Sequence, residues 1–566
     1  MKKYSVKKNP RIYTPIDNFR HLLSICESRV GRPAFKYPKG KEFVTVTYDE
    51  FAVMAKSVAA GLKAAGLEGK RVAVIGETSP EWVATYLGVV AGGGVIIPMD
   101  KELAVSEIEG FLAGVDAEAI VYSGSFNDKL AATVESHPTL KKFIPMVLKS
   151  EGESILPLGT LMELGRAELE RGYTLPERDT NSMAIMLFTS GTTGTSKCVM
   201  LSEHNICSCV NAACASTNFS SEDTTLSVLP LHHTYELAIM IASLTYGMLV
   251  GINDTLSHLM RNVKEIRPTG LVLVPLFVNT IYKRIMGEAK KKGKDKLLLN
   301  MIPVSNGLRR IGIDLRRKFF ASVLEPFGGR LCKVICGGAP LNPEMVHNFE
   351  AFGIQICEGY GITECSPLIA VAPYFDNRPG SVGPACPCCS VRIAATGKND
   401  KGYDEGEIQV KGENVMLGYY KNDEANASAF TEDGWYRTGD VGYLGADDYI
   451  YITGRLKSVI VLENGKNVFP EEIEEYLENI EEIAESVVVG RKAEDGETVL
   501  LTAIVFPNRE LFPEGTDNDT IRKAIWAKIA EQNKQMPSFK KIMGLELRDT
   551  EFEKTTSRKI KRHLVK

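Results

Sequence analysis

Short apolar runs rich in β-branched residues alternate with helical patterns along most of the chain. The runs at 71–76, 271–274 and 333–336 have strand length, whereas 48–65 and 343–352 have helical patterns. Strands that alternate with helices build largely parallel sheets, because each helix returns the chain to the same edge. The pattern therefore predicts an α/β fold. A chain of 566 residues is also too long for one ordinary core, so two or more domains are expected.

A change in composition near residue 454 predicts the domain boundary. Glycine-rich turns and strand patterns precede it, and the helix pattern 470–477 follows it. This helix opens with a proline and carries acids in its first turn, as the helix dipole prefers. We therefore expect a large domain over 1–454 and a small C-terminal domain over 455–566, joined by a linker at 454–457.

Positive and negative charges nearly balance. The chain has 67 Lys and Arg against 71 Asp and Glu, a net charge of −4, so no nucleic-acid partner is expected from bulk charge. The basic N-terminus lacks a following apolar stretch and is not a secretory signal, which predicts a cytoplasmic protein. The lysine-rich stretch 290–296 is predicted to be a solvated loop, with peripheral contact to the inner, anionic membrane surface as the alternative.

Two long uncharged runs and the cysteines also need interpretation. The runs 82–99 and 237–253 contain glycine, proline or polar residues and have acidic flanks, so we expect buried helix-and-turn segments rather than membrane spans. Twelve cysteines include the C-x-x-C pair Cys386 and Cys389, but no second such pair completes a structural zinc site. Reduced, mostly buried thiols are therefore expected.

A strand pattern at 183–188 runs into a loop rich in Ser, Thr and Gly that ends at Lys197. Glycines let the backbone approach a polyanion closely, hydroxyls donate to phosphate oxygens, and the lysine adds positive charge. The lysine favours phosphate binding over the alternative of a flexible turn. The spacing differs from the G-x-x-x-x-G-K-[ST] pattern, so a P-loop NTPase is not implied. The candidate phosphate ligands are Thr189, Ser190, Gly191, Thr192, Thr193, Gly194 and Lys197.

Two further segments have residue types suited to a nucleotide. The turn at Gly337, Gly338 and Ala339 would leave room for a flat ligand beside bare backbone, although it could equally be a tight turn. In 358–364, Tyr360 offers an aromatic face for a purine, and Thr363 can donate to a phosphate. Glu364 is a hard oxygen ligand suited to Mg²⁺.

The loop and several later motifs, in the same order, resemble those of the adenylate-forming superfamily. This superfamily includes acyl-CoA synthetases, luciferases and peptide-synthetase adenylation domains, and the resemblance covers about residue 20 to the C-terminus. It implies a large N-terminal domain of stacked α/β sheets with a β-barrel-like part, and a small, mobile C-terminal α+β domain.

The resemblance also implies roles for individual residues. Thr189, Glu364, His233 and Lys559 match catalytic positions: His233 would gate the carboxylate pocket, Glu364 would hold Mg²⁺, and Lys559 would reach the carboxylate and α-phosphate. The residues implied to bind the nucleotide, in addition to the phosphate loop, are Gly337, Gly338, Ala339, Glu358, Gly359, Tyr360, Gly361, Thr363, Asp440, Arg455 and Lys457. Within this set, Asp440 and Arg455 match the ribose site and Lys457 the hinge. From the residues alone, Asp440 and Arg455 could be an ordinary surface pair.

The sequence departs from the family pattern at two places. Arg558 stands where the family has a glycine beside the catalytic lysine, which puts the flexibility of that loop in doubt. The segment after the hinge lacks the second lysine that some relatives carry near Val461, so no role of that lysine is transferred.

The family's chemistry is the activation of an acid with ATP to an acyl-AMP, followed by transfer to a thiol. The pattern looks most like bacterial long-chain acyl-CoA synthetases, which implies a fatty acid, ATP, Mg²⁺ and coenzyme A. Two alternatives remain: a ligase that loads an acyl carrier protein, and a non-catalytic binder of fatty acid or nucleotide. A homodimer is a further expectation.

Overall fold

The computed structural model describes residues 13–130, 133, 140–147, 154–189, 196–291, 293, 295–374, 376–462, 467–493, 498–554 and 560–565. Residue contacts divide the chain into two compact units made of discontinuous segments. Unit 1 comprises Met1–Ala339, Pro343–Ser390 and Lys411–Gly434. Unit 2 comprises Pro340–Asn342, Val391–Val410 and Trp435–Lys566. The domain boundary expected at residue 454 stays a prediction.

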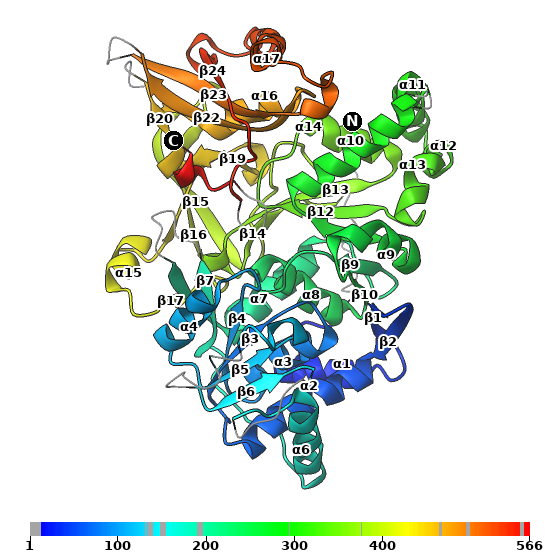
Figure 1. Cartoon of the computed structure of the whole chain (residues 1–566), viewed down its shortest axis with the longest axis vertical. Helices are drawn as coiled ribbons and strands as arrows, with labels where there is room; N and C mark the ends of the chain where they lie inside the picture. The colour runs from blue at the N-terminus through cyan, green and yellow to red at the C-terminus, as the bar shows by residue number, and fades with distance from the viewer. Residues whose placement is uncertain are drawn as a thin grey trace. The chain divides into compact units, whose positions relative to one another are not determined.

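The larger sheet of unit 1 has the strand order β14-β13-β12-β11-β9-β10-β1-β2 (Figure 1). Its inner strands pair in parallel, whereas the edge strands β2 and β14 are antiparallel to their neighbours. The strands are β1 Pro33–Lys39, β2 Glu42–Thr47, β9 Thr224–Ser227, β10 Leu249–Ile252, β11 Gly270–Leu273, β12 Lys333–Gly337, β13 Gln355–Gly361 and β14 Leu368–Val371. β11 is buried along its whole length, as parallel strands covered on both faces are.

The second sheet of unit 1 has the order β17-β8-β7-β4-β3-β5-β6. β7 and β8 form an antiparallel hairpin, and β17 adds to the outer edge of β8 from a distant part of the sequence. The strands are β3 Arg71–Ile75, β4 Val95–Met99, β5 Ala119–Tyr122, β6 Lys142–Pro145, β7 Met183–Thr189, β8 Lys197–Ser202 and β17 Gly418–Tyr419. These two sheets confirm the predicted α/β fold.

The helices of unit 1 begin at the signals that the sequence supplies. Thr47 and Glu50 form a reciprocal capping box at the start of α2, and Ser79 followed by Pro80 opens α3. The helices are α1 Phe19–Glu27, α2 Tyr48–Ala64, α3 Pro80–Ala91, α4 Val105–Gly114, α6 Leu158–Glu170, α7 Glu203–Ser216, α8 Thr234–Tyr246, α9 Leu259–Ile266, α10 Pro275–Lys291, α11 Asp295–Arg310, α12 Arg316–Phe319, α13 Ala321–Leu324, α14 Pro343–Phe352 and α15 Asp423–Ala429.

The two long uncharged runs are buried, as predicted. The first comprises most of α3 followed by β4, and the second comprises most of α8 followed by β10. Gly247 ends α8 in the left-handed conformation, with φ of 83°, where a glycine is favoured. Across the described ranges, no helix combines the length and apolar character needed to span a membrane.

The lysine-rich stretch differs from its prediction as a loop. Lys290 and Lys291 complete the last turn of α10, and α11 begins at Asp295. The helix dipole favours cations at a helix C-terminus, so the same charges that indicated solvent exposure also stabilise this helix end.

All twelve cysteines are free thiols, and ten of them are buried. Cys386 and Cys388 pack in an apolar cluster with Ala212, Cys357 and Val371. The part of the chain with assigned positions contains no group of three or more His, Cys, Asp or Glu side chains that could hold a metal. The expectation of buried, unpaired thiols is therefore confirmed.

Unit 2 contains three smaller sheets, with the orders β15-β16-β18-β19, β20-β21 and β22-β23-β24. The core around the last of these is built from α16, α17 and the inner faces of β22 and β23. The strands are β15 Cys389–Lys398, β16 Asp404–Gly412, β18 Tyr436–Leu444, β19 Ile450–Arg455, β20 Ile460–Val461, β21 Asn467–Val468, β22 Ile483–Lys492, β23 Val499–Pro507 and β24 Gly544–Leu547; the helices are α16 Pro470–Glu478 and α17 Asn518–Gln532.

Candidate active site

The predicted phosphate loop connects β7 to β8. Thr189 and Lys197 are directly opposed in this antiparallel pair, and the Thr189 hydroxyl donates to the Lys197 carbonyl at 3.4 Å. Ser190, Gly191, Thr192, Thr193 and Gly194 lie outside the described residues. The hairpin therefore brings the first and last candidate residues of the loop side by side.

A tyrosine that sequence reasoning missed connects this hairpin to Glu364. Tyr419 lies on β17 opposite Val199 of β8, and its side chain is buried. The Lys197 ammonium lies 4.6 Å from the centroid of the Tyr419 ring, within cation–π range. The Tyr419 hydroxyl donates to Glu364 Oε1 at 2.9 Å. Tyr419 thus stands between the cation of the phosphate loop and the candidate metal ligand.

Glu364 is held in a tight turn between β13 and β14. Its backbone carbonyl accepts from the Met416 amide at 2.8 Å, so two atoms of this residue contact the segment that carries Tyr419. Gly361 precedes the turn, and a Cβ there would lie 1.8 Å from the Pro367 carbonyl oxygen. Only glycine fits at this position, because the returning strand passes too close for any side chain.

The surroundings of Glu364 suit a hard cation. The carboxylate is half-buried, and within the described ranges it forms no ion pair that would neutralise it. Carboxylate oxygens are ligands that Mg²⁺ prefers, and Mg²⁺ in nucleotide sites takes one or two protein carboxylates and completes its shell with phosphates and water. The residues present therefore fit a Mg²⁺ ion that is shared with a nucleotide.

The glycine turn and the Glu358 segment meet at the carboxyl ends of two parallel strands. Gly337 of β12 is the register partner of Gly359 of β13. A Cβ on Gly337 would lie 3.0 Å from the Gly359 carbonyl oxygen and 3.3 Å from the ring of Tyr235. Gly338, with φ of 101°, follows as an exposed residue. The bare backbone expected for a flat ligand is therefore present, and Tyr235 is a second residue that sequence reasoning missed.

The other residues predicted around this segment differ in their exposure, from the buried Tyr360 to the exposed Gly361. Tyr360 is 7% exposed, and Glu358 accepts from the Gly380 amide at 3.3 Å. Thr363 is half-buried at the start of the Glu364 turn, and Ala339 is exposed.

His233 caps the N-terminus of α8 beside a second histidine. Its ring lies 4.2 Å from that of His232, measured between centroids. His232 Nε2 lies 3.4 Å from Oδ2 of Asp100, the residue that directly follows β4. Asp100, which sequence reasoning missed, thus links the end of the second sheet to the histidine pair.

One turn into α8, Glu236 is buried and receives a short hydrogen bond from Ser227. Burial raises the pKa of Glu236 to about 8, although the Ser227 hydroxyl and the neighbouring backbone amides oppose this shift. The carboxyl group therefore keeps its proton near neutral pH. It adjoins an apolar cluster of Leu229, Val272, Val274 and Ile335, with Phe219, Tyr235, Ile239 and Phe277 packed against it.

The candidate ribose pair lies in unit 2. Asp440 of β18 and Arg455 of β19 are register partners, and Arg455 Nε lies 2.9 Å from Asp440 Oδ1. Asp440 is only 3% exposed, so the pair is part of a sheet rather than a surface turn. Lys457 follows in a short 3₁₀ turn, Leu456–Ser458, and is exposed.

Lys559 and Arg558 lie outside the described residues, but residues on both sides of them are described. Lys554 and Ile560 form an antiparallel bridge, and the Lys554 ammonium contacts Glu485 and, at 2.8 Å, Glu551. Arg562 pairs with Glu474 of α16, whose side chain is 14% exposed. Burial is the main reason that the pKa of Glu474 rises to about 7, and Arg562 opposes that rise.

Comparison with known proteins gives matches over nearly the whole chain. The family model described as AMP-binding enzyme matches residues 24–420, and the model of the AMP-binding enzyme C-terminal domain matches residues 457–566. A relative in Mycobacterium bovis, long-chain-fatty-acid–CoA ligase FadD15, is 30% identical over 466 residues, which are 79% of this chain and 75% of the relative.

Two further matches bear on the acceptor and the fold. The chloroplastic long-chain-fatty-acid–[acyl-carrier-protein] ligase AEE15 of Arabidopsis thaliana is 27% identical over 580 residues, covering 89% of this chain and 78% of that protein. The crystal structure of ATP-bound MatB from Rhodopseudomonas palustris has a TM-score of 0.72 at 24% identity, covering 97% of this chain and 98% of that one. At this identity the structural likeness shows the fold alone.

Proposed function

Since the chain belongs to the AMP-binding enzyme family, we propose that it activates a long- or medium-chain fatty acid as acyl-AMP and transfers it to coenzyme A. The relatives named as long-chain-fatty-acid–CoA ligases support this substrate class. The products are acyl-CoA, AMP and pyrophosphate.

The observation that carries the proposal is the Lys197–Tyr419–Glu364 arrangement at the base of the Ser/Thr/Gly loop. Attack of a carboxylate on a triphosphate brings negative charges together, and fixed cations and donors placed in advance lower that cost. Lys197 and the loop hydroxyls would bind phosphate oxygens. Glu364, oriented by Tyr419, would hold Mg²⁺, which when bound supplies positive charge beside the phosphates.

In the first step, a carboxylate oxygen forms a bond to the α-phosphorus and the bond to pyrophosphate breaks. Lys559 is the proposed source of positive charge between the carboxylate and the α-phosphate. In the second step, the thiol sulfur forms a bond to the acyl carbon, the bond to AMP breaks, and the thiol proton is released. Asp440 and Arg455 would hold the ribose, because a carboxylate can accept from two neighbouring hydroxyls.

An apolar acid suits the surroundings of Gly337. The Tyr235 ring lies 3.3 Å from the place that a Cβ on this glycine would take, and it belongs to the apolar cluster between α8, β11 and β12. An alkyl chain that enters this cluster would leave its carboxylate near His233, the residue proposed to gate it. Asp100 and His232 would fix the position of His233.

A carrier protein is the second candidate acceptor, favoured by the match to the acyl-carrier-protein ligase. We also propose peripheral contact with the inner membrane surface, because the stretch 290–296 is rich in lysine and such stretches are attracted to anionic membrane surfaces. The homodimer and the cytoplasmic location stay predictions.

The test measures AMP release with acids of increasing chain length, with coenzyme A and acyl carrier protein as separate acceptors. We expect the highest rate with a long- or medium-chain acid and coenzyme A. Lys559→Ala should lose ATP–pyrophosphate exchange but largely keep thioester formation from supplied acyl-AMP. Equal loss of both half-reactions would contradict the role of Lys559. If none of the acids, whatever its chain length, supports AMP release, the proposal is wrong.

A further inference from the structure

The C-x-x-C pair of the sequence lies in a tight turn near the end of the second segment of unit 1. The Cys389 amide donates to the Cys386 carbonyl at 3.0 Å, and Pro387 occupies the second position of the turn, where proline is favoured. The Cα atoms at the two ends of such a turn lie within about 7 Å of each other. A disulfide needs a Cα separation of about 4.4–6.8 Å, so the backbone brings these two cysteines into the range that a disulfide requires.

The side chains of the two cysteines also lie close together. Cys386 and Cys388 are buried in one apolar cluster, and Cys389 packs against the same cluster. Burial raises the pKa of Cys386, and the neighbouring Cys389 and Cys209 raise it further, as groups at short range do. The turn therefore places a protonated, buried thiol beside the thiol of Cys389.

Cys389 is the member of the pair that an oxidant would meet first. Its side chain is half-buried, whereas Cys386 is 2% exposed. A hydrogen bond from the Cys388 thiol lowers the pKa of Cys389; burial opposes this shift, and the Asn414 side chain supports it. The thiolate is the nucleophilic form of cysteine, and a second thiol beside it is typical of redox-sensitive sites.

Cys332 provides a comparison elsewhere in unit 1. Of the twelve cysteines, all of which the structure describes, only Cys332 and Cys389 are not buried. Cys332 directly precedes β12, and its thiol donates to the Thr269 carbonyl at 3.4 Å. Burial raises the pKa of Cys332, although Lys333 opposes the rise. Partial exposure is thus common to both cysteines, but Cys332 belongs to no C-x-x-C turn.

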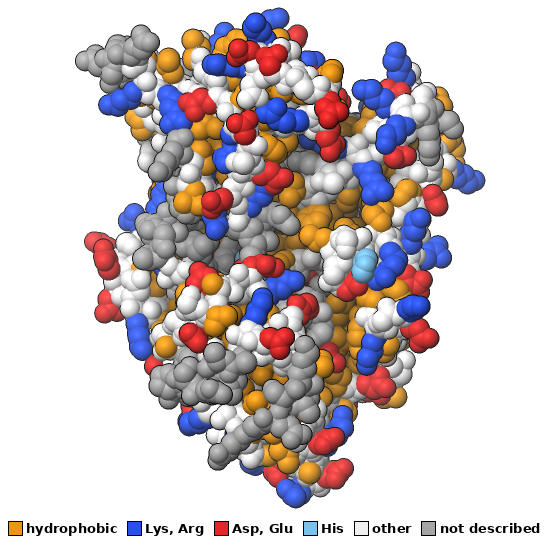
Figure 2. All heavy atoms as spheres, in the orientation of Figure 1, with side chains coloured by type: hydrophobic (Ala, Val, Ile, Leu, Met, Phe, Trp, Pro, Cys, Tyr) orange, Lys and Arg blue, Asp and Glu red, His pale blue; other side chains and the backbone are white. Residues whose placement is uncertain are grey.

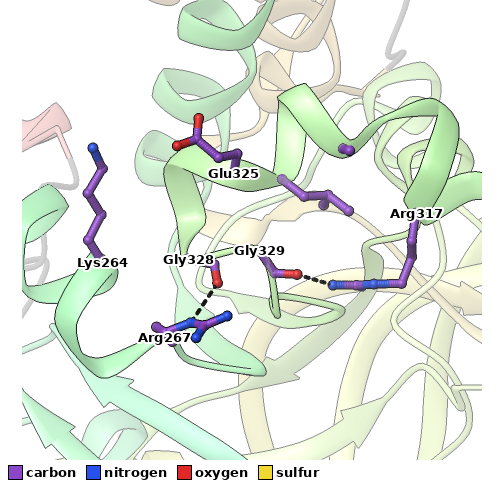
Figure 3. A pocket seen from close by; sticks show the side chains of 8 residues that line it. Lys264, Arg267, Arg317, Glu325, Gly328 and Gly329 are labelled. Atoms are coloured by element: carbon purple, nitrogen blue, oxygen red, sulfur yellow. Dashed lines mark hydrogen bonds between the residues drawn. The ribbon is translucent and has the colours of Figure 1, made fainter.

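A basic pocket with a volume of about 390 Å³ lies at the turn that leads to Cys332. The basic residues that line it are Lys264, Arg267 and Arg317 (Figure 3). Figure 2 shows blue side chains gathered over the region where Figure 1 places α10 to α13. Positive charge stabilises a thiolate, so basic surroundings alone would favour oxidation at Cys332, whereas a neighbouring thiol favours Cys389. One molecule therefore contains both causes of thiol reactivity at separate places.

The cysteine turn is attached to the strand that follows Glu364. The Cys386 amide and the Cys389 thiol both donate to the Ile369 carbonyl of β14, at 2.8 Å and 3.5 Å. The thiol hydrogen of Cys389 is therefore part of the contact that holds the turn against β14.

Asn414 extends this contact to the Glu364 turn. Its side chain is buried and forms a hydrogen bond with Cys389. Its carbonyl accepts from the Ser366 hydroxyl at 2.8 Å. The Met416 amide, two residues later, donates to the Glu364 carbonyl at 2.8 Å. A change at the Cys389 sulfur is thus connected to the candidate metal ligand through hydrogen bonds.

We propose that Cys386 and Cys389 form a reversible disulfide when the protein meets a peroxide, and that this disulfide loosens the turn that holds Glu364. Pairing of Cys388 with Cys389 is disfavoured, because a disulfide between sequence neighbours would force the peptide bond between them out of its plane. The Cys388 carbonyl also accepts from the Glu413 amide at 2.9 Å, which holds that peptide in place. In reducing compartments, disulfides are mostly transient and serve catalysis or redox sensing.

Hydrogen peroxide is the oxidant in this reaction. The Cys389 sulfur forms a bond to one peroxide oxygen, the O–O bond breaks, and the other oxygen leaves as water with the Cys389 thiol proton. The Cys386 sulfur then forms a bond to the Cys389 sulfur, the S–O bond breaks, and the hydroxyl group leaves as water with the Cys386 thiol proton. The two thiols lose two electrons in total, and the peroxide is reduced to two molecules of water.

The inference deepens the proposed function, and its consequence for catalysis rests on that function. A disulfide sulfur has no hydrogen to donate to the Ile369 carbonyl, and at Cys389 it would turn towards Cys386 and away from Asn414. Because Glu364 is the residue proposed to hold Mg²⁺, oxidation should weaken the use of MgATP and leave the rest of the nucleotide site intact.

The first test counts thiols in the complete protein after treatment with hydrogen peroxide, by alkylation under denaturing conditions and mass spectrometry. The unchanged protein should lose two alkylation sites, and dithiothreitol should restore both. Cys386→Ser and Cys389→Ser should lose no pair, whereas Cys388→Ser and Cys332→Ser should still lose two sites. Cys386→Ala should behave like Cys386→Ser, which shows that a buried hydroxyl is not the cause.

The second test examines the Glu364 turn with and without catalysis. Fatty-acid-dependent ATP–pyrophosphate exchange should fall roughly fivefold on oxidation, as for the loss of one hydrogen bond, and half-maximal exchange should need more Mg²⁺. Amide hydrogen exchange over residues 362–370 and 412–418 should become faster in the oxidised protein, and this measurement requires no activity. Cys389→Ser keeps a hydroxyl donor towards Ile369, so it should match the unchanged protein before peroxide treatment and not respond to peroxide.

Three results would overturn the inference: a thiol count that peroxide does not lower by two, a pair that still forms in Cys386→Ser, or an oxidised protein with unchanged amide exchange over the Glu364 turn. A protein that forms the disulfide and shows the faster amide exchange, but activates no fatty acid, would contradict the proposed function and support the redox pair. Failure of the redox pair and failure of the proposed function are therefore distinguishable, because neither the thiol count nor the amide exchange needs a substrate.

Discussion

The hydroxyl of Tyr419 should determine how well Glu364 is oriented to bind Mg²⁺. Tyr419→Phe removes one oxygen, the donor 2.9 Å from Glu364 Oε1, and keeps the ring against which Lys197 packs. A hydrogen bond to a charged group contributes roughly 1.5–3 kcal/mol. Because the charge of Glu364 remains and only its orientation is lost, we expect the lower end, about a tenfold fall in kcat/KM for MgATP.

The assay is fatty-acid-dependent ATP–pyrophosphate exchange over a range of Mg²⁺ concentrations. Tyr419→Phe should also raise the Mg²⁺ concentration needed for half-maximal exchange, which a purely structural defect would not do. Tyr419→Leu should cost a further factor of about three, because it removes the cation–π contact as well.

The neighbouring residue provides the control. The Tyr420 hydroxyl accepts from Arg71 at 3.0 Å and donates to Asp116 at 3.4 Å, so Tyr420→Phe also removes hydrogen bonds, but none to Glu364. Its exchange rate should stay unchanged. The reasoning is refuted if Tyr419→Phe stays within about twofold of the unchanged enzyme at every Mg²⁺ concentration, or if Tyr420→Phe shows the same loss.

Three other perturbations test separate parts of the structure. Asp440→Asn should raise KM for ATP about tenfold and leave KM for coenzyme A unchanged in steady-state assays, because it weakens a buried hydrogen-bond acceptor held by Arg455. The control Asp404→Asn changes an exposed aspartate that pairs with Lys398, and it should change neither KM value. Gly361→Ala should lower the thermal midpoint and abolish exchange, since its Cβ would meet the Pro367 carbonyl at 1.8 Å, whereas Gly359→Ala, whose nearest neighbours are at 3.9 Å, should keep its midpoint. Burial raises the pKa of Glu236 from 4.5 to about 8, so between these pH values only the folded state keeps the proton, and this group lowers the free energy of unfolding by about 1.4 kcal/mol per pH unit as pH rises. In urea unfolding between about pH 5.5 and pH 7.5, the free energy of unfolding of Glu236→Gln should therefore fall by about 3 kcal/mol less than that of the unchanged protein. Parallel plots of unfolding free energy against pH would contradict a buried neutral carboxyl group.

The sequence predicts those parts of the site that are local in the chain. The strand before Thr189, the run at 333–336 and the helix at 343–352 each carry their own pattern, and the structure has β7, β12 and α14 there. Lys197 and Glu364 could be selected because each ends a short motif whose residue types match a phosphate or a metal.

Tyr419 and Asp100 could not be found in this way. Tyr419 belongs to a strand of two residues, too short to show a period, and it pairs with β8 more than 200 residues earlier in the chain. Asp100 follows a buried strand as any surface acid might, and only the tertiary fold sets it beside His232. The protonated state of Glu236 likewise depends on burial, which a short motif does not specify.

The segment 411–434 belongs to unit 1, although unit 2 supplies the chain on both sides of it. During synthesis on the ribosome, β8 must therefore wait for more than 200 further residues before its outer edge is covered by β17. An exposed strand edge invites pairing with other chains, so a nascent chain that pauses before residue 418 carries an aggregation hazard that the finished protein lacks. It also follows that no single cut separates the two units: a fragment that stops before residue 411 leaves that edge open, and one that begins at residue 435 has lost β15 and β16.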